Sequence, residues 1–410
     1  MASFSIAVSG LQADTIALDT IGNNLANLNT TAFKDQSTSF EDLFYQQMGV
    51  SGTNNPIQVG VGTRVSGTEA NFLQGTILPT AGQPSNMALS GDGFFVTEQD
   101  GIQTLTRAGD FQLDQSGNLI STSGSSVMGY PVNNGVVNTN AALVPITLPV
   151  GVTEAAQATS QIDITANLNA GSTVGTSFTT PVTIYDSLGQ SHALTVTYTK
   201  TAANSWDYSV GLQSGDATGT PTNTTGTLTF DSNGNLVSPS GDVTGITFPG
   251  LTNGASDLSV SLDLFGSNGN STLTQLTSPS TNTATLQDGF ASGTYSSFSV
   301  DNDGVISALY TNGHKAVVGQ VAVARVTNPD GLAMIGNNSY ATTNASGNAI
   351  YGTPGTGGRA TIEDSAIEQS NVDISQEFSN LIVAQRSFEA NSKTITTFDS
   401  VTQAAMSMIR

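Results

Sequence analysis

The sequence predicts an α+β protein that is mostly β, with an α-helix at each end and nested all-β domains between the two helices. Three observations predict this class. Apolar residues recur every seven positions near both ends, alternating segments joined by Gly-containing turns fill the middle, and only 10% of the 410 residues are charged. At roughly 100–200 residues per domain, this length allows two to four domains.

The N-terminal helix is expected within residues 1–30. Its apolar stripe consists of Phe4, Leu11, Leu18 and Leu25, with Ala7, Ile21 and Leu28 at the adjoining position. Only Asp14 interrupts this stripe. A seven-residue repeat of this kind is typical of a helix that packs against another helix.

Asparagine is unusually frequent at the end of this helix, although it is a poor helix former. Asn23, Asn24 and Asn27 stand within two turns, and Asn391 repeats the feature near the other terminus. A neutral amide both donates and accepts hydrogen bonds. We therefore expect these side chains to contact neighbouring copies of the chain without the repulsion that like charges would cause.

A second, longer helix is expected over residues 372–408, within a terminal segment 370–410. At 1.5 Å per residue, it would be about 55 Å long. Its stripe consists of Ile374, Leu381, Phe388 and Ile395, with Ala384, Phe398 and Ala405 at the adjoining position. Two partners remain open for this stripe: the N-terminal helix of the same chain, or helices of other copies.

Residues 31–70 show no sustained periodicity and contain several Gly and scattered aromatic residues. They predict an extended connector with one short helical piece around Phe40–Gln47. A loop of this length needs a functional reason or external support.

The β-rich middle predicts a discontinuous inner β domain, residues 71–145 and 284–369. A separate outer domain, residues 146–283, is inserted into it as a sandwich or barrel. One turn pattern, Asp followed three residues later by Gly, recurs in 111–120, 228–237 and 298–307. It predicts hairpins whose Asp caps the turn and whose Gly takes a positive φ. A calcium loop is disfavoured in 298–307, because its twelfth position would be Asn312 rather than Glu.

Composition narrows the function. The net charge is −21 with only ten basic residues, which argues against binding nucleic acid. The chain has no cysteine and no apolar run long enough to span a membrane. Asp186, Ser187 and His192 are the residue types of a catalytic triad, but no nucleophile-elbow motif accompanies them. No catalytic residue, cofactor or metal site is therefore predicted.

Three segments together carry a resemblance to a known family. "SGLQADTIALDTIGNNLANLNTTAFK" (9–34) resembles the N-terminal signature of the flagellar rod and hook axial proteins, and "SNVDISQEFSNLIVAQRSFEANSKTITTFDSV" (370–401) resembles their C-terminal signature. "LSGDGFFVT" (89–97) and "TLTRAGDFQLDQSGNLISTSGSSVMGY" (104–130) resemble their shared β motif. "TIYDSLGQSHALTVTY" (183–198) is similar to the outer domain of the hook members. One departure is Ala32, where the family usually has Gly.

The resemblance implies a structural role. A member with a large inserted domain is expected to be a subunit of the flagellar hook, a curved flexible tube that acts as a universal joint between rod and filament. Implied partners are many copies of itself, the rod and hook–filament junction proteins, the hook cap and the type III export apparatus. The N-terminus lacks the basic and apolar segments of a secretory signal. We therefore expect an extracellular location in the flagellum, reached without signal cleavage.

From the resemblance and the two stripes we predict an assembly interface formed by Leu11, Leu18, Ile21, Asn23, Asn24, Leu25, Asn27, Leu28, Ile374, Phe378, Leu381, Phe388, Asn391, Ile395 and Phe398. Two alternatives remain: a distal rod subunit, and, from another class, an exported β-rich adhesin or surface hydrolase. The second would explain the Ser, Thr and Asn content but not the matched stripes at both ends.

Overall fold

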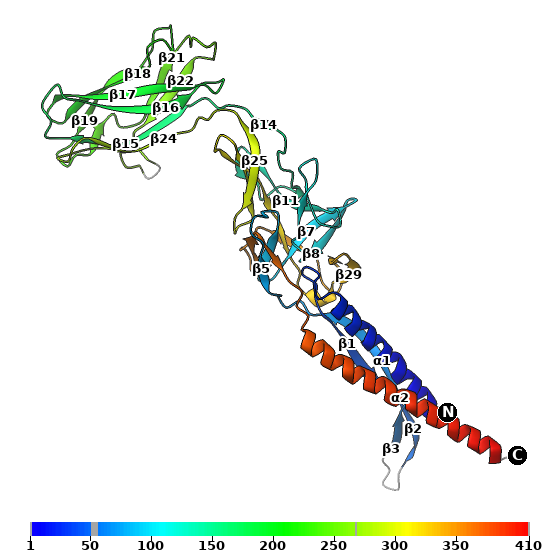
Figure 1. The fold of residues 1–410 in the computed structure, drawn as a ribbon. Helices are drawn as coiled ribbons and strands as arrows, with labels where there is room; N and C mark the ends of the chain where they lie inside the picture. The colour runs from blue at the N-terminus through cyan, green and yellow to red at the C-terminus, as the bar shows by residue number, and fades with distance from the viewer. Residues whose placement is uncertain (1, 51–55, 267–268, 409–410) are drawn as a thin grey trace. The chain divides into compact units, whose positions relative to one another are not determined.

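The computed structural model describes residues 2–50, 56–266 and 269–408 (Figure 1). It confirms the predicted class, because the chain is mostly β and has a helix at each end, α1 (Ala2–Ala26) and α2 (Ile374–Met408). Two compact units form. Unit 1 contains Met1–Val150, Phe298–Ala308 and Ala316–Arg410, and unit 2 contains Gly151–Ser297 and Leu309–Lys315. The four-part domain division made above stays a prediction.

The two terminal helices pack against each other within one chain. Asp373 begins α2 as an N-cap, because its carboxylate accepts the N–H groups of Ser375 (2.8 Å) and Gln376 (3.1 Å). Gly10 allows close approach of the helices, since a Cβ there would lie 2.7 Å from Nδ2 of Asn391. The α2 stripe therefore has at least one partner inside its own chain.

Strands, not a helix, follow α1. The strands are β1 (Gln36–Asp42), β2 (Tyr45–Val50), β3 (Pro56–Gly60) and β4 (Thr63–Ala70). β1 pairs antiparallel with β4, this ribbon contacts α1, and β2 pairs with β3. The helical piece predicted around Phe40–Gln47 is therefore wrong. Pairing with two partner strands overrides the local helix propensity of this segment, since Phe40 pairs with Val65 and Tyr45 pairs with Gly60.

The central sheet of unit 1 contains the order β27-β11-β7-β8-β30-β29. β28 joins β7 to β31, and three short strands, β10, β12 and β13, pair with β11. The remaining bounds in unit 1 are β5 (Ile77–Pro79), β6 (Met87–Ser90), β7 (Phe94–Gln99), β8 (Ile102–Thr106), β9 (Gln112–Leu113), β10 (Leu119–Ile120), β11 (Ser126–Asn133), β12 (Val136–Val137), β13 (Val144–Pro145), β28 (Val323–Arg325), the 3₁₀ helix η1 (Pro329–Gly331), β29 (Ala333–Gly336), β30 (Ser339–Ala341), β31 (Ile350–Gly352), β32 (Thr361–Asp364) and β33 (Ala366–Glu368).

Two small pairings bring the end of the chain back to its first third. β32 pairs with β6, and β33 pairs with β5, both antiparallel. Three strands have residues assigned to both units: β25 (Gly293–Val300), β26 (Val305–Tyr310) and β27 (Lys315–Val321). Through the β32–β6 and β33–β5 pairings, the residues immediately before α2 are bonded to strands from residues 77–90.

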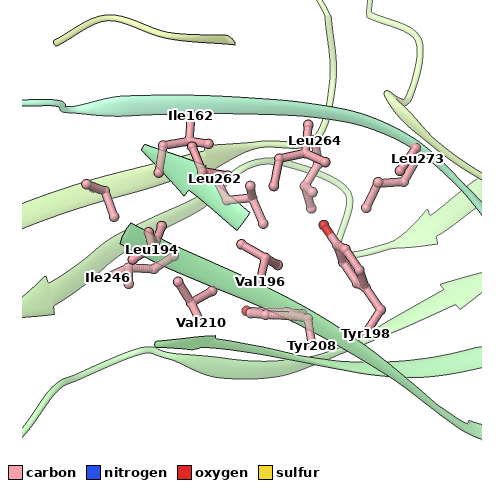
Figure 2. Packing of buried hydrophobic residues seen from close by; sticks show 14 of the residues in the cluster. Ile162, Leu194, Val196, Tyr198, Tyr208, Val210, Ile246, Leu262, Leu264 and Leu273 are labelled. Carbon is pink, nitrogen blue, oxygen red and sulfur yellow. The ribbon is translucent and has the colours of Figure 1, made fainter. Parts of the chain in front are cut away.

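Unit 2 is a sandwich of two sheets with one core. One sheet has the order β21-β22-β15-β23, with β24 on β15, and the other has the order β16-β17-β18-β19-β20. Buried and outward residues alternate along β15 and β17, as expected for a sheet with one buried face. Figure 2 shows Tyr198 and Val196 of β17 directed toward Leu262 of the opposite sheet and Leu264, which directly follows that strand.

The strands of unit 2 are β14 (Thr153–Glu154), β15 (Gln161–Asn169), β16 (Ser177–Tyr185), β17 (Ser191–Ala202), β18 (Ser205–Leu212), β19 (Thr225–Phe230), β20 (Leu236–Ser238), β21 (Val243–Phe248), β22 (Leu258–Asp263), β23 (Leu273–Leu276) and β24 (Thr281–Gln287). β14 pairs with β25 through Thr153 and Glu154.

The repeated Asp–Gly turns are confirmed. Asp114, Asp231 and Asp301 each accept backbone N–H groups two and four residues ahead, at 2.8–3.0 Å. The glycines that follow them three residues later have φ near +80°. Asp186 makes the same turn, although it lies outside the three repeats found in the sequence. Each carboxylate thus satisfies backbone groups that a tight turn leaves unpaired.

Ala32 takes a left-handed conformation, with a φ of 54°. Its N–H donates to the carbonyl oxygen of Glu368 at 2.8 Å, and the residue is buried. Only Gly adopts this conformation without steric cost. The departure from the usual Gly therefore leaves the turn in place and adds backbone strain there.

Candidate functional site

The predicted assembly residues lie on α1 and α2, except Asn27 and Leu28, which directly follow α1, and they differ in exposure. Ile21 and Asn24 are buried, and Asn23, Ile374, Phe378 and Phe388 are exposed. The remaining nine are partly buried: Leu11, Leu18, Leu25, Asn27, Leu28, Leu381, Asn391, Ile395 and Phe398. Their role between copies stays a prediction.

Asn24 connects three elements within one chain. Its Nδ2 donates to the carbonyl oxygen of Gln36 at 2.8 Å, and its Oδ1 accepts the N–H of Gln36 at 3.0 Å. The same Nδ2 lies 3.3 Å from Oε2 of Glu377 on α2. An ionised carboxylate could not donate and an ammonium could not accept, whereas the amide makes both bonds to the backbone of Gln36.

The other predicted amides also have partners in the same chain. Nδ2 of Asn27 donates to Oδ1 of Asn23 at 3.1 Å, one turn earlier. Nδ2 of Asn391 donates to Oδ2 of Asp14 at 2.8 Å and joins α2 to α1. Asp14, which interrupts the apolar stripe, is therefore a helix-pairing residue.

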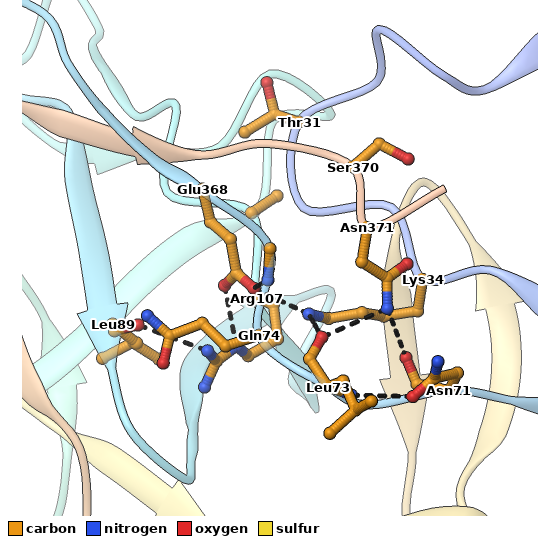
Figure 3. Close-up of polar contacts among 12 residues, drawn as sticks. Thr31, Lys34, Asn71, Leu73, Gln74, Leu89, Arg107, Glu368, Ser370 and Asn371 are labelled. Carbon is orange, nitrogen blue, oxygen red and sulfur yellow. Dashed lines mark hydrogen bonds and ion pairs between the residues drawn. The ribbon is translucent and has the colours of Figure 1, made fainter. Parts of the chain in front are cut away.

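A buried ionic cluster holds the base of the helix pair (Figure 3). Oε1 of Glu368 accepts Nζ of Lys34 at 2.7 Å and the N–H of Gly75 at 2.8 Å. Oε2 of Glu368 accepts Nε of Arg107 at 3.0 Å. Glu368 is fully buried, and Nζ of Lys34 also donates to the carbonyl oxygen of Leu73 at 2.7 Å.

Arg107 extends the cluster into the central sheet of unit 1. Its guanidinium donates to the carbonyl oxygens of Leu89, Gly91 and Gly93. Burial lowers the pKa of Lys34, although Glu368 acts in the opposite direction. Burial also raises the pKa of Tyr340 to about 12, with the Glu368 charge contributing. The cluster therefore contains buried ions whose charges depend on one another.

Asn371 makes the same kind of bridge as Asn24 at the other end of the chain. Its Oδ1 accepts the N–H of Asp35 at 2.7 Å, and its Nδ2 donates to the carbonyl oxygens of Asn71 (2.8 Å) and Leu73 (3.1 Å). Asn371, just before α2, is thus bonded both to Asp35 in the segment after α1 and to the segment 71–73 that follows β4.

Sequence reasoning missed Lys34, Arg107 and Glu368 as a unit. One signal was available: the chain has only ten basic residues, and two of them stand in motifs without any other charged residue, "TAFK" and "TLTRAG". A basic residue at such a position predicts a buried partner. The partner could not be identified, because Glu368 lies 334 residues after Lys34.

His192 is enclosed between two carboxylates of unit 2. Its Nε2 lies 3.0 Å from Asp186, and its Nδ1 lies 3.0 Å from Asp216. Oγ of Ser187 accepts the N–H of Ser256 instead. Both ring nitrogens are occupied by carboxylates, so this histidine has no nitrogen free to act as a base toward Ser187.

The described residues contain neither a metal-binding cluster nor a membrane-spanning helix. Nowhere among them do three His, Asp or Glu side chains gather in a way that could hold a metal ion. The helices in this part of the chain are also too polar to cross a membrane.

Four family models match the chain. They are "Flagella basal body rod protein" (residues 4–34), "Flagellar hook protein FlgE/F/G D1 domain" (88–167), "Flagellar basal body protein FlaE D2 domain" (165–290) and "Flagellar basal body rod FlgEFG protein C-terminal" (363–408).

Relatives match over nearly the full length of the chain. Flagellar hook protein FlgE of Salmonella typhimurium is 36% identical, covering 97% of this chain and 98% of that protein. The protein of the same name from Treponema pallidum is 31% identical over 100% of both chains. The crystal structure of Helicobacter pylori flagellar hook protein FlgE2 is similar in fold, with a TM-score of 0.55 at 17% identity, covering 71% of this chain and 100% of that one.

Replacing Glu368 by Gln should destabilise unit 1 by about 3–5 kcal/mol, because two buried cations lose their counter-charge. Thermal unfolding followed by circular dichroism measures the change. The matched control is Glu363→Gln, an exposed glutamate on β32 five residues earlier. Equal melting temperatures for the two variants would show that the cluster does not support the fold.

The stability of unit 2 should depend on pH through His192. Burial lowers its pKa, but hydrogen bonds with Asp186 and Asp216 outweigh burial and raise it above the usual 6.5. A raised folded-state pKa gives stability that is complete below about pH 6.5 and is lost as the pH rises through the folded value. The pKa of Asp186 is lowered, as its hydrogen bonds outweigh burial, so its contribution is lost only in acid.

Calorimetry between pH 6 and pH 9 should therefore show the melting temperature of unit 2 falling. His192→Gln should remove this dependence, whereas the control His314→Gln should keep it. A fall of the same size in His192→Gln would assign the effect to another group.

Proposed function

Because this chain belongs to the flagellar hook protein family and is a structural subunit of the hook, we propose that its copies form a curved, flexible helical tube. This tube would act as a universal joint between rod and filament. The observation that carries the proposal is the outer surface of α2, where Ile374, Phe378 and Ile382 are 45–52% exposed. A row of exposed apolar residues of this kind is typical of a protein-binding surface.

The assembly residues predicted from the sequence belong to this proposal. The exposed members, Asn23, Ile374, Phe378 and Phe388, would contact other copies directly. The buried and partly buried members would hold the α1–α2 pair in the shape that the contact requires. A tube that grows by head-to-tail addition needs two different surfaces on each subunit.

The wider setting is part of the same proposal. The chain would pass unfolded through the flagellar type III export apparatus without signal cleavage. It would assemble under the hook cap and contact rod and junction proteins at the two ends of the tube. Its role would be structural rather than catalytic. The enclosed His192 supports this view, since the site that most resembled a triad has no free base.

The nested domain layout is also a proposal. It consists of terminal helices (1–30 and 370–410), a connector (31–70), an inner β domain (71–145 and 284–369) and an inserted outer domain (146–283). Support comes from unit 2, where the chain enters and leaves along neighbouring backbone: Gln157 and Phe290 form an antiparallel bridge. A deletion that began at residue 146 would also remove Ile146 and Leu148, which are buried in unit 1.

Electron microscopy of purified protein at rising concentration tests the proposal. Curved tubes support it, straight tubes favour a distal rod subunit, and monomeric particles that bind carbohydrate favour an adhesin.

Phe378→Asp should raise the concentration needed for tube formation about tenfold or more, because an apolar side chain can no longer be buried between copies. Pelleting by ultracentrifugation measures the threshold. Phe378 is half exposed, so the monomer should keep its circular dichroism spectrum. The matched control is Ser379→Asp, which places the same charge on the adjacent exposed residue. If Phe378→Asp assembles at the wild-type threshold, this surface is not an interface.

Replacing residues 159–288 by two glycines should leave a chain that still polymerises. The bridge between Gln157 and Phe290 holds the two ends close together, so a short linker closes the gap. Microscopy should show thinner tubes with altered curvature, since outer contacts are lost. A folded deletion variant that forms no tube would contradict the nested layout.

A further inference from the structure

A groove of about 450 Å³ lies between α1, β1 and α2. Its lining includes the small or apolar residues Ala17, Ile21 and Ala384. Three carboxylates also line it: Asp14 on α1, Asp35 before β1 and Glu377 on α2. We name it the carboxylate groove after these three residues.

The three carboxylates receive neutral donors but no cation from the described chain. Asp14 accepts Nδ2 of Asn391, and Glu377, 7% exposed, accepts the amides of Asn24 and Asn380. Oδ1 of Asp35 is buried and has no hydrogen-bond partner within the described residues. None of the three takes part in the ion pairs found there. Glu377 is the buried member of the three, and a buried negative charge without a counter-charge is costly, which favours a cationic partner.

Basic side chains are scarce in this protein, and five of the ten are already engaged. Lys34 and Arg107 belong to the ionic cluster, and Arg64 pairs with Glu41. Lys200 and Arg359 donate to backbone carbonyl oxygens.

Two basic residues on α2 are exposed and make no ion pair in the described chain: Arg386 and Lys393. They are seven residues apart and therefore share one face of the helix. Ile382, one turn before Arg386, is 51% exposed on the same face. We name Ile382, Arg386 and Lys393 the basic stripe.

We propose that the basic stripe of one copy binds the carboxylate groove of the next copy in the tube. This inference rests on the proposed function and identifies the two surfaces that head-to-tail growth requires. The charges complement each other, and Ile382 supplies an apolar contact for the lining of the groove. Close ion pairs across an interface fix register and suppress wrong partners. The contact would thus set the position of each helix pair against its neighbour.

The test is a charge exchange in the full-length chain. Arg386→Glu should raise the threshold concentration for tubes about tenfold or more, because one attraction becomes a repulsion. Asp14→Arg should do the same. The double variant Arg386→Glu with Asp14→Arg should recover most of the loss. The matched control is Gln385→Glu, which adds negative charge at the neighbouring exposed position and should assemble close to the wild-type threshold.

A second measurement does not depend on the threshold. The chain has no cysteine, so single cysteines are clean probes. A mixture of Asp14→Cys and Arg386→Cys chains, oxidised after tube assembly, should give a cross-linked dimer. A mixture of Asp14→Cys and Arg325→Cys chains, in which the partner cysteine lies elsewhere on unit 1, should not.

The outcomes separate the two ideas. Wild-type tubes together with an unaffected Arg386→Glu variant and no 14–386 cross-link would overturn this contact and leave the proposed function standing. Wild-type protein that stays monomeric at every concentration would overturn both. Tubes that dissolve in a chelator but tolerate Arg386→Glu would assign the groove to a divalent cation and also overturn the proposal.

Discussion

The fold of unit 1 depends on one buried carboxylate. Glu368 neutralises Lys34 and Arg107 while accepting the N–H of Gly75, so the segment after α1, the end of β8 and the last strand before α2 meet at two oxygen atoms. The carboxylate is costly to bury and more costly to remove, since its loss would leave two cations inside the protein. The ionic cluster therefore fixes the chain segments that lead from α1 and into α2, even though much of the helix surface is exposed.

Two asparagine side chains add further bonds at the ends of the helices. Asn24 and Asn371 each bind backbone on both a donor and an acceptor, one at the end of α1 and the other before α2. The sequence predicts that Asn23, Asn24, Asn27 and Asn391 contact neighbouring copies. In the structure Asn24, Asn27 and Asn391 donate hydrogen bonds within one subunit, and a contact of the exposed Asn23 with other copies stays a prediction.

Much of this structure could be predicted because it is local. The helices follow from seven-residue repeats, and Asp114 and Asp231 could be assigned to turns because their partners stand two and four residues away. The β1–β4 ribbon could not be predicted, since Phe40 pairs with Val65 and no local signal shows that partner. The same reason hid the pairing of Lys34 with Glu368 and the enclosure of His192 by Asp216. In each case, residue type suggested a partner and only the three-dimensional fold could identify it.

The separation between Lys34 and Glu368 along the chain also affects the order in which parts of the fold can form. The Asp–Gly turns close within five residues, so each can form as soon as its own segment is free, and short loops close fastest. The ionic cluster needs residues 34 and 368 together, which are 334 positions apart. Under the proposed export route, in which the chain arrives unfolded and one end first, the hairpins would form early and the ionic cluster last. A subunit would then complete its pair of terminal helices only after nearly all of its chain had arrived.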